Sequence, residues 1–438
     1  MTPPTAQLLA LFHQPPAVST DTRKVQPGDL FFTLKGERFD GNRFAAQALE
    51  TGAAYAIIDN PAFLPPGDAR YLLVGDALLA LQDLARAYRR EFDIPLLGLT
   101  GSNGKTTTKE LIHAVLGSER RAYATAGNFN NHIGVPLTLL AMPRDTEIAV
   151  VEMGANQPGD IAELAAIAEP TQGLITNVGA AHLEKLGDLD GVQRTKGALF
   201  DFIQTHGGTI FLNEDDPRVV AAARHIPQRI TYGTPQSDFH YRLLENRPGE
   251  MRIEVRCDAW LEPQTFISYL SGEYNCMNIL AAIAVGSYFG ISVEGMKRGI
   301  AAYVPRNNRS EIVEKQGRTL WLDAYNANPS SMRAAIANLF ALRKDKVALI
   351  LGDMFELGEG SERLHAELGR FIDDFQPALT VGVGPMMQAT TAQMTAPTAW
   401  FPDVDTAQGE LPDLLKGMEL VLVKGSRGMA LERLVEAL

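Results

Sequence analysis

Cysteine and long apolar runs are scarce in this sequence of 438 residues. The only cysteines are Cys257 and Cys276, which are too few for a disulfide framework and are typical of a reducing compartment. The N-terminal segment lacks a basic start, and its apolar stretch is too short for a secretory signal. The most apolar segment, 276–293, is interrupted by glycine and polar residues, so it indicates a buried helix. We therefore expect a cytoplasmic protein without membrane insertion.

Positive charge is also in short supply. Lysine and arginine total 40 against 52 aspartate and glutamate, a formal net charge of −12. Such a surface repels nucleic acid and anionic membranes, so neither is expected as a partner. An anionic ligand must instead be bound by a local arrangement of donors. The composition, with 45% hydrophobic and 21% charged residues, excludes disorder and collagen-like repeats.

Length and pattern predict an α/β protein of three domains, at roughly 150 residues per domain. Residues 1–92 contain short strands and two helices, the second beginning after the expected N-cap Asp76, as expected for a small α/β domain. Strands alternate with helices over 93–305, which predicts a doubly wound parallel sheet, although 238–270 alternate as hairpin strands. After a linker, residues 306–438 combine a hairpin with further strand–helix units. This last segment predicts a smaller, Rossmann-like domain.

The sharpest local signal is Thr-Gly-Ser-Asn-Gly-Lys-Thr-Thr at 100–107, between an apolar strand and a helix. Glycines let backbone N–H groups surround phosphate oxygens, and the helix N-terminus adds positive potential. The lysine would reach the β- and γ-phosphates, and the next hydroxyl would bind Mg²⁺. The strict motif spacing is not met because Leu99 replaces its first glycine, so a tight turn is the alternative. The predicted loop comprises Gly101, Ser102, Asn103, Gly104, Lys105, Thr106 and Thr107.

Polar side chains also follow the next predicted strands. Glu152 ends the strand at 148–152, and His182 comes soon after the strand at 173–178. A carboxylate at this end of a parallel strand, beside a phosphate loop, is where a Mg²⁺ ligand is expected. A solvated strand-end glutamate and an ordinary hydrogen-bonded histidine are the alternatives. The pattern around Lys196 indicates only a solvated helix face.

Three further polar groups lie at helix starts or strand ends. Asn275 and Asn278 share one helix face and either cap the helix or recognise a nucleotide base. Segment 323–332 has proline, asparagine and serine typical of a helix start, but capping does not require all of Asp323, Tyr325, Asn326 and Asn328. The basic, glycine-rich segment 424–428 suits a carboxylate or a phosphate as well as a helix cap.

Taken in order, these residues resemble the Mur ligase family of ATP-dependent enzymes that form amide bonds. The likeness covers essentially the whole chain. Segments 19–41, 323–329 and 352–358 resemble the family member that joins D-Ala-D-Ala to a UDP-N-acetylmuramoyl-tripeptide in peptidoglycan precursor synthesis. The other matching positions are Glu152, Asn177, His182, Lys196, Asn275, Asn278, Arg309, Asp323 and Lys424. After Lys196 the family often has Gly-Glu, whereas this chain has Gly197-Ala198.

The resemblance implies ATP, two Mg²⁺ ions and an acyl-phosphate intermediate. Its catalytic and metal-binding residues would be Lys105, Thr106, Glu152, His182 and Lys196, the last as a carbamate. Adenine would contact Asn275 and Asn278, and the ribose and phosphates would contact Arg309 and Asp323. The substrate residues would be Ser19, Thr20, Arg23 and Lys35 for the UDP-sugar, Thr125, Asn128, Asn130 and Asn131 for the acceptor carboxylate, and Asn328, Lys424, Ser426 and Arg427 for the dipeptide.

Other functions remain as alternatives. Another Mur-type ligase that adds the third amino acid would be expected to show Asp-Tyr-Ala-His at position 323 and a downstream Asp-Asn-Pro-Arg, and neither is present. A folylpolyglutamate synthase would be expected to have a histidine in that segment and to lack this N-terminal domain. A regulatory ATPase could use the same phosphate loop but would not need three α/β domains. We expect a monomer.

Overall fold

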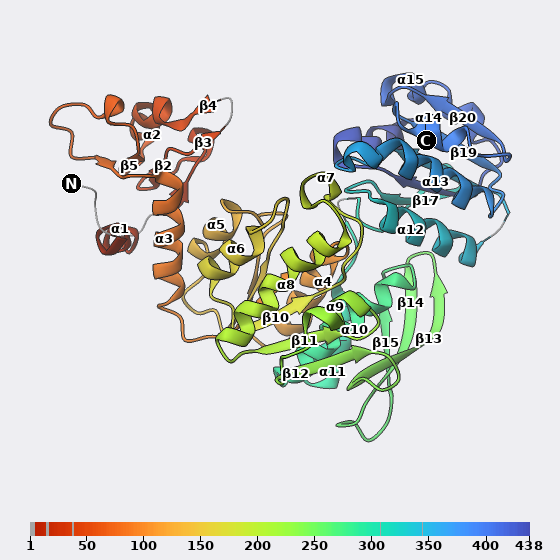
Figure 1. Ribbon diagram of the computed structural model, residues 1–438, viewed down its shortest axis with the longest axis horizontal. Helices are drawn as coiled ribbons and strands as arrows, with labels where there is room; N and C mark the ends of the chain where they lie inside the picture. Colours follow the sequence, from red (N-terminus) through yellow and green to blue (C-terminus); the bar gives the residue numbers. More distant parts are fainter. Residues whose placement is uncertain (1–4, 15–16, 37–38, 307, 344) are drawn as a thin grey trace.

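The computed structural model describes residues 5–14, 17–36, 39–306, 308–343 and 345–438. Three bodies follow one another along the molecule, and each is built on its own main sheet (Figure 1). The predicted α/β class with three domains is therefore confirmed. Residues 37 and 38 of the first-domain segment at 19–41 lie outside the described residues.

The first domain is a small sheet of four parallel strands in the order β1-β2-β5-β6, with helices on both faces. Alternate residues of β2 point to opposite faces: Phe31 packs with α2, whereas Leu30 and Phe32 join the cluster that includes α3. Its elements are α1 (Thr5–Phe12), β1 (Val18–Ser19), β2 (Leu30–Phe32), β3 (Lys35–Gly36), β4 (Phe39–Asp40), α2 (Ala45–Thr51), β5 (Tyr55–Ile58), β6 (Tyr71–Leu73) and α3 (Ala77–Arg89).

Helix α3 connects this domain to the next one. Asp76 caps it as predicted, since its side chain accepts a hydrogen bond from the backbone N of Leu79 at 2.8 Å. The buried face of α3, with Leu81 and Leu84, belongs to one apolar cluster with residues of the central domain such as Leu139. The first domain is thus attached through a shared core as well as through the chain (Figure 1).

The central sheet has nine strands in the order β15-β14-β13-β12-β11-β10-β7-β9-β8. Pairing is parallel from β8 to β13 and antiparallel from β13 to β15, so the hairpin strands predicted at 238–270 extend the same sheet. The strands are β7 (Leu96–Thr100), β8 (Ala122–Ala124), β9 (Ile148–Glu152), β10 (Gln172–Ile175), β11 (Thr209–Asn213), β12 (Arg229–Gly233), β13 (Phe239–Arg247), β14 (Glu250–Cys257) and β15 (Gln264–Ser268).

Helices cover both faces of this sheet, as the doubly wound prediction requires. One face packs against α4, α10 and α11, and the other against α5, α6 and α8. Most of the apolar segment at 276–293 forms a buried helix, as predicted, but this helix ends at Tyr288 and the next begins at Val293. No described helix is long and apolar enough to cross a membrane. The helices are α4 (Lys105–Gly117), α5 (Gly134–Leu140), α6 (Asp160–Ala168), α7 (Leu183–Leu186), α8 (Leu189–Thr205), α9 (Pro217–Ala222), α10 (Tyr274–Tyr288) and α11 (Val293–Ala302).

The C-terminal sheet has six strands in the order β16-β17-β21-β18-β19-β20, parallel except for the predicted hairpin β16–β17. Two apolar clusters cover its two faces. Its strands are β16 (Glu311–Lys315), β17 (Arg318–Asp323), β18 (Val347–Gly352), β19 (Leu379–Val383), β20 (Thr398–Phe401) and β21 (Leu420–Lys424), and its helices are α12 (Pro329–Leu342), α13 (Ser361–Asp373), α14 (Met387–Thr391), α15 (Val404–Gln408) and α16 (Leu411–Leu414).

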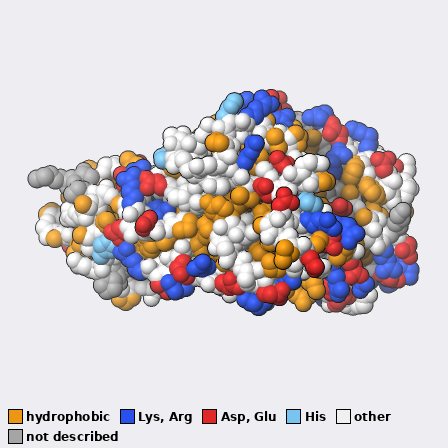
Figure 2. Space-filling model, turned by 90° about the horizontal axis from the view of Figure 1, so that it is seen from below, with side chains coloured by type: hydrophobic (Ala, Val, Ile, Leu, Met, Phe, Trp, Pro, Cys, Tyr) orange, Lys and Arg blue, Asp and Glu red, His pale blue; other side chains and the backbone are white. Residues whose placement is uncertain are grey.

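The surface carries mixed charge. On the face shown in Figure 2, acidic and basic side chains are interspersed with each other and with apolar groups. On this face (Figure 2) the charges of both signs form a mosaic, so attraction of an anionic ligand there depends on local donors.

Candidate active site

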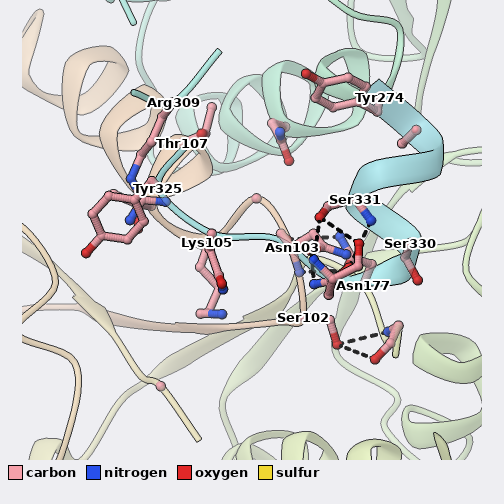
Figure 3. Close-up of a pocket in the computed structure, with 18 of the residues that line it drawn as sticks. Ser102, Asn103, Lys105, Thr107, Asn177, Tyr274, Arg309, Tyr325, Ser330 and Ser331 are labelled. Carbon is pink, nitrogen blue, oxygen red and sulfur yellow. Dashed lines mark hydrogen bonds between the residues drawn. The ribbon is translucent and has the colours of Figure 1, made fainter. Parts of the chain in front are cut away.

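The candidate site lies at the carboxyl ends of the central parallel strands. Strand β7 pairs with β9 on one side and with β10 on the other, so the strand order reverses around β7. Ligands of doubly wound sheets bind in the crevice at such a point. A cavity of about 540 Å³ lies here, lined by both the central and the C-terminal domains (Figure 3). Among the predicted residues, it is lined by Ser102, Asn103, Gly104, Lys105, Thr106, Thr107, Asn128, Asn130, Glu152, His182, Asn275, Asn278, Arg309, Asp323, Asn328 and Lys424.

The predicted phosphate loop follows β7 and opens α4. Gly104 has a φ of +77° and directly precedes the helix, a conformation that L side chains rarely adopt. A Cβ at Gly101 would lie 1.8 Å from the hydroxyl of Thr176, so only glycine fits there. The carbonyl of Asn177 accepts from Ser102 N at 3.0 Å, and the Asn177 side chain accepts from Asn103 N at 2.9 Å. The loop is therefore preorganised by the end of β10.

These contacts explain one difference from the sequence prediction. The strand expected at 173–178 ends at Ile175. The backbone N of Thr176 still donates to Thr100 O of β7 at 2.9 Å. The side chains of Thr176 and Asn177, however, donate to the carbonyl of Asn103 at 2.7 and 3.0 Å and so hold the phosphate loop.

Two lysines converge on a single backbone carbonyl. Lys105 Nζ donates to Gly101 O at 2.7 Å, and Lys196 Nζ donates to the same oxygen at 3.0 Å. Burial lowers the pKa of Lys105, the charge of Glu152 opposes this shift, and Arg309 adds to it. Burial and the charge of Lys105 lower the pKa of Lys196 well below its usual value.

The interpretation of Lys196 as a solvated helix residue was wrong. Its side chain is only 1% exposed, on the face of α8 that packs against the sheet. Within the described part of the chain, no carboxylate forms an ion pair with it. Burying an unpaired ammonium is costly, so the neutral amine is favoured.

Glu152 occupies the buried end of β9 and is 1% exposed. Its Oε1 accepts hydrogen bonds from Thr106 Oγ1 at 3.2 Å and from Asn130 Nδ2 at 2.8 Å. Its Oε2 has no hydrogen-bond partner among the described residues, although it is buried. A buried carboxylate oxygen of this kind requires a partner, and it sits beside a hydroxyl at the phosphate loop. This donor set fits a Mg²⁺ ion.

His182 lines the same cavity from the loop after β10. It lies in the left-handed region, with φ +54°, and directly precedes α7. Its Nδ1 contacts Glu356 Oε2 of the C-terminal domain. His182 of the central domain is thus held by Glu356 of the C-terminal domain.

The C-terminal domain contributes a second charged group. The guanidinium of Arg309 lies 3.4 Å from the ring centroid of Tyr325, a cation–π contact (Figure 3). Lys424 Nζ donates to Asp323 Oδ2 at 2.5 Å and to the carbonyl of Asn326 at 3.2 Å. Asp323 and Lys424 are register partners on the neighbouring strands β17 and β21.

Replacing Lys424 with methionine should destabilise the C-terminal domain. Lys424 is 1% exposed, and its loss leaves Asp323 without its counter-charge, at a cost of about 3 kcal/mol in the free energy of unfolding. The exposed pair Lys416–Asp413 supplies the control, since Lys416→Met should cost less than about 1 kcal/mol. Urea titration followed by the fluorescence of the buried Trp321 measures both values. Equal losses would contradict the structural importance of the buried pair.

Asparagine side chains join the two domains at the phosphate loop. Asn328 caps α12 in a capping box, as the helix-start pattern predicted. Its Nδ2 also donates to Asn103 Oδ1 of the loop at 2.7 Å. The start of α12 is therefore docked directly on the phosphate loop.

Asn275 and Asn278 lie in the first turn of α10, and their side chains are already paired. Asn275 Nδ2 donates to Ser271 O at 2.7 Å, and Asn278 Nδ2 donates to Asn275 Oδ1 at 2.8 Å. Asn278 Oδ1 accepts from Thr108 Oγ1 at 3.0 Å. No side chain of the described residues caps the start of α10, so the capping alternative is wrong, and these bonds instead support Ser271 and the helix that follows the phosphate loop. Asn278 also lines a second cavity of about 510 Å³.

Several predicted residues lie away from the cavity lining. Thr125 and Asn131 act locally: the Thr125 hydroxyl accepts from Glu152 N at 3.0 Å, and Asn131 Oδ1 accepts from Gly134 N at 2.8 Å. Ser426 accepts from Phe355 N at 2.9 Å, and Arg427 pairs with Glu432. The first-domain residues contribute none of the cavity lining; they are Ser19, Thr20, Arg23 and Lys35.

The structure adds lining residues that were not singled out as ligands. Tyr274, Tyr325, Ser330 and Ser331 reach the cavity from the starts of α10 and α12 and from the loop after β17 (Figure 3). The two serines stand directly after Pro329 at a helix start, and this signal was assigned to capping alone. The stacking of Tyr325 depends on the position of Arg309 and has no signature in local spacing.

Comparison with known proteins places these features in a family. The Mur ligase family catalytic domain matches residues 16–89, the Mur ligase middle domain 99–286, and the Mur ligase glutamate ligase domain 308–427. The UDP-N-acetylmuramoyl-tripeptide--D-alanyl-D-alanine ligase of Bacillus subtilis is 41% identical over 96% of this chain and 92% of its own length.

Two solved structures share the fold over nearly the whole chain. The crystal structure of MurF from Acinetobacter baumannii aligns with a TM-score of 0.87 and 32% identity, covering 96% of this chain and 92% of that one. MurF ligase from Thermotoga maritima, in complex with ADP, aligns with a TM-score of 0.86 and 28% identity, covering 98% and 97%. With its matching domains and the phosphate loop at the switch point of its central sheet, this chain belongs to the Mur ligase family.

Proposed function

We propose that this chain is an ATP-dependent ligase that joins D-Ala-D-Ala to a UDP-N-acetylmuramoyl-tripeptide in peptidoglycan precursor synthesis. The main support is the composition of the cavity. It is lined by a phosphate loop, by a buried carboxylate with one unpaired oxygen, and by a basic strand end from another domain. The curated relative from Bacillus subtilis has this activity in its name. The protein acts as a monomer in the cytoplasm.

The chemistry requires activation of a carboxylate, which is a poor acyl donor. ATP phosphorylates the terminal carboxylate of the tripeptide, and the amine of the dipeptide attacks the acyl phosphate, releasing phosphate. Both steps develop negative charge on phosphoryl or tetrahedral oxygens. Lys105 and the backbone N–H groups of residues 104–107, which line this cavity, would stabilise this charge.

Magnesium fits the acidic side of the cavity. Thr106 and Glu152 would hold one ion, in keeping with the unpaired Oε2 of Glu152. His182 and a carbamate on Lys196 would hold a second ion. When bound, such ions neutralise phosphoryl charge and orient the oxygens that react. The chain's own contribution is to hold these ligands on rigid strand ends.

The surroundings of Lys196 support a carbamate on its amine. Its amine is buried beside Lys105 and shares a carbonyl acceptor with it. Two like unit charges about 4 Å apart repel by about 4 kcal/mol at an effective dielectric of 20, and a divalent ion roughly doubles the repulsion. Addition of CO₂ to the neutral amine, with loss of one proton, forms an N–C bond and gives the side chain a negative charge.

The remaining residues bind the substrates. Asn275 and Asn278 contact adenine, and Arg309 and Asp323 contact the ribose and phosphates. The UDP-sugar is bound in the first domain by Ser19, Thr20, Arg23 and Lys35. In this structure Lys35 Nζ forms an ion pair with Asp59 Oδ1 at 2.8 Å. The acceptor carboxylate contacts Thr125, Asn128, Asn130 and Asn131. The dipeptide contacts Asn328, Lys424, Ser426 and Arg427.

Phosphate release should depend on both substrates. With ATP and Mg²⁺, we expect release only when the UDP-muramoyl-tripeptide and D-Ala-D-Ala are present together, with a ligated product of matching mass. Mass spectrometry of a panel of acceptor peptides and dipeptides identifies the preferred third residue. Hydrolysis at the same rate without either substrate would contradict the ligase function and favour a regulatory ATPase.

A further inference from the structure

The contact between the central and C-terminal domains includes two short loops. One loop consists of His182 and the short helix α7 (Leu183–Leu186) of the central domain, and it meets the loop 353–360 of the C-terminal domain. The side-chain contact joins His182 Nδ1 to Glu356 Oε2. The backbones also meet, since Glu184 N donates to Glu356 O at 3.2 Å. The backbone contact keeps the loops together independently of the Glu356 side chain.

His182 and Glu356 both have backbone conformations in the left-handed region. His182 has φ +54° and Glu356 has φ +62°, and neither is glycine. Left-handed backbone is uncommon for residues with a Cβ, and it persists only where the surrounding structure requires it. Here each left-handed residue directs its side chain across the domain boundary to the other. The backbone strain at His182 and Glu356 therefore occurs where their side chains pair.

The imidazole of His182 presents different groups to the two sides. Nδ1 is taken by Glu356, whereas Nε2 has no hydrogen-bond partner in the described ranges, and the residue lines the cavity. Histidines that bind metals almost always donate their other ring N–H to a carboxylate or carbonyl, which sets the tautomer and the ring orientation. The carboxylate of Glu356, the imidazole of His182 and the cavity are arranged in this way, and the carboxylate comes from another domain.

We propose that Glu356 is the positioning residue for His182, so that the C-terminal domain completes the second metal site only when it is docked. This inference rests on the proposed role of His182 as a metal ligand. Because binding free energies are reciprocal, a metal ion on His182 in turn favours the docked arrangement. Metal loading and domain docking are coupled through one hydrogen-bonded side chain.

The test uses Mn²⁺ binding to the full-length protein with a non-hydrolysable ATP analogue, measured by electron paramagnetic resonance. Glu356→Gln should weaken the second Mn²⁺ by roughly 10- to 100-fold and leave the first unchanged. Glu359→Gln is the matched control, since Glu359 is an exposed residue of the same loop with no ion pair in the described chain. Spin labels on the two domains should show that Mn²⁺ increases docking less in Glu356→Gln than in wild type.

The outcomes separate this inference from the proposed metal site. If His182→Ala loses the second Mn²⁺ but Glu356→Gln binds it as Glu359→Gln does, the positioning role of Glu356 is wrong. If His182→Ala itself binds two Mn²⁺ ions like wild type, the metal role of His182 is wrong. In the double variant the two losses should be less than additive, because each removes the same hydrogen-bonded unit.

Discussion

Lys105→Ala should abolish ligation, lowering kcat by on the order of 100-fold or more, equivalent to about 3 kcal/mol of transition-state stabilisation. Lys105 Nζ stands 2.7 Å from Gly101 O at the start of α4, inside the cavity. Its charge adds to that of the helix N-terminus where phosphoryl oxygens would lie. Because negative charge increases as the phosphoryl group transfers, loss of this cation should affect the reaction step more than binding. Steady-state kinetics of phosphate release measures the effect.

The control for this variant is Lys297→Ala. Lys297 pairs with Glu294 on the surface of α11 and does not line the cavity. It should keep kcat within a factor of two or so, as surface substitutions usually do. Thermal unfolding should confirm that Lys105→Ala is folded. A folded Lys105→Ala protein with near-normal kcat would exclude the phosphate-loop assignment.

Lys196→Ala should lose activity on the order of 100-fold, and millimolar formate or acetate should restore part of it. Removal of the side chain leaves a buried space beside Gly101 O and Lys105. A short carboxylic acid can enter this space and present oxygens to a metal ion, as the carbamate on Lys196 would. The measurement is the ligation rate against the concentration of added acid.

Rescue should be specific to this position. Lys105→Ala should not respond to formate, because a carboxylate cannot replace a phosphate-binding cation. Full activity of Lys196→Ala without added acid, or an unmodified amine seen with Mg²⁺, nucleotide and acceptor bound, would contradict the carbamate. The family glutamate that often follows this lysine is replaced by Ala198, so the result also shows whether a carbamate needs that neighbour.

Much of the site followed from chain order alone. Lys105, Glu152 and His182 each come after a predicted strand, and parallel strands place their carboxyl ends at one edge of a sheet. The strand–helix alternation from residue 96 onward therefore predicted that these side chains would meet, and they line one cavity. Asp76 and Asn328 were likewise recognisable as helix caps because capping is a local property.

Short elements were harder to predict. Strand β8 has three residues and β20 has four, with little of the alternation that distinguishes a strand from a loop. Both lie at the edges of their sheets and are formed by pairing with a single neighbour, β9 or β19. Their existence depends on a partner strand distant in the chain.

Local sequence pattern thus predicts the order of elements, the phosphate loop and the strand ends that carry functional groups, because these depend on periodicity and on the geometry of parallel strands. Packing between elements and domains sets the rest. Lys196 looks solvated until α8 is laid on the sheet beside Gly101, and Glu356 has no visible role until its loop meets His182. Burial and contacts between distant residues depend on how the domains dock, and no short spacing in the chain encodes that arrangement.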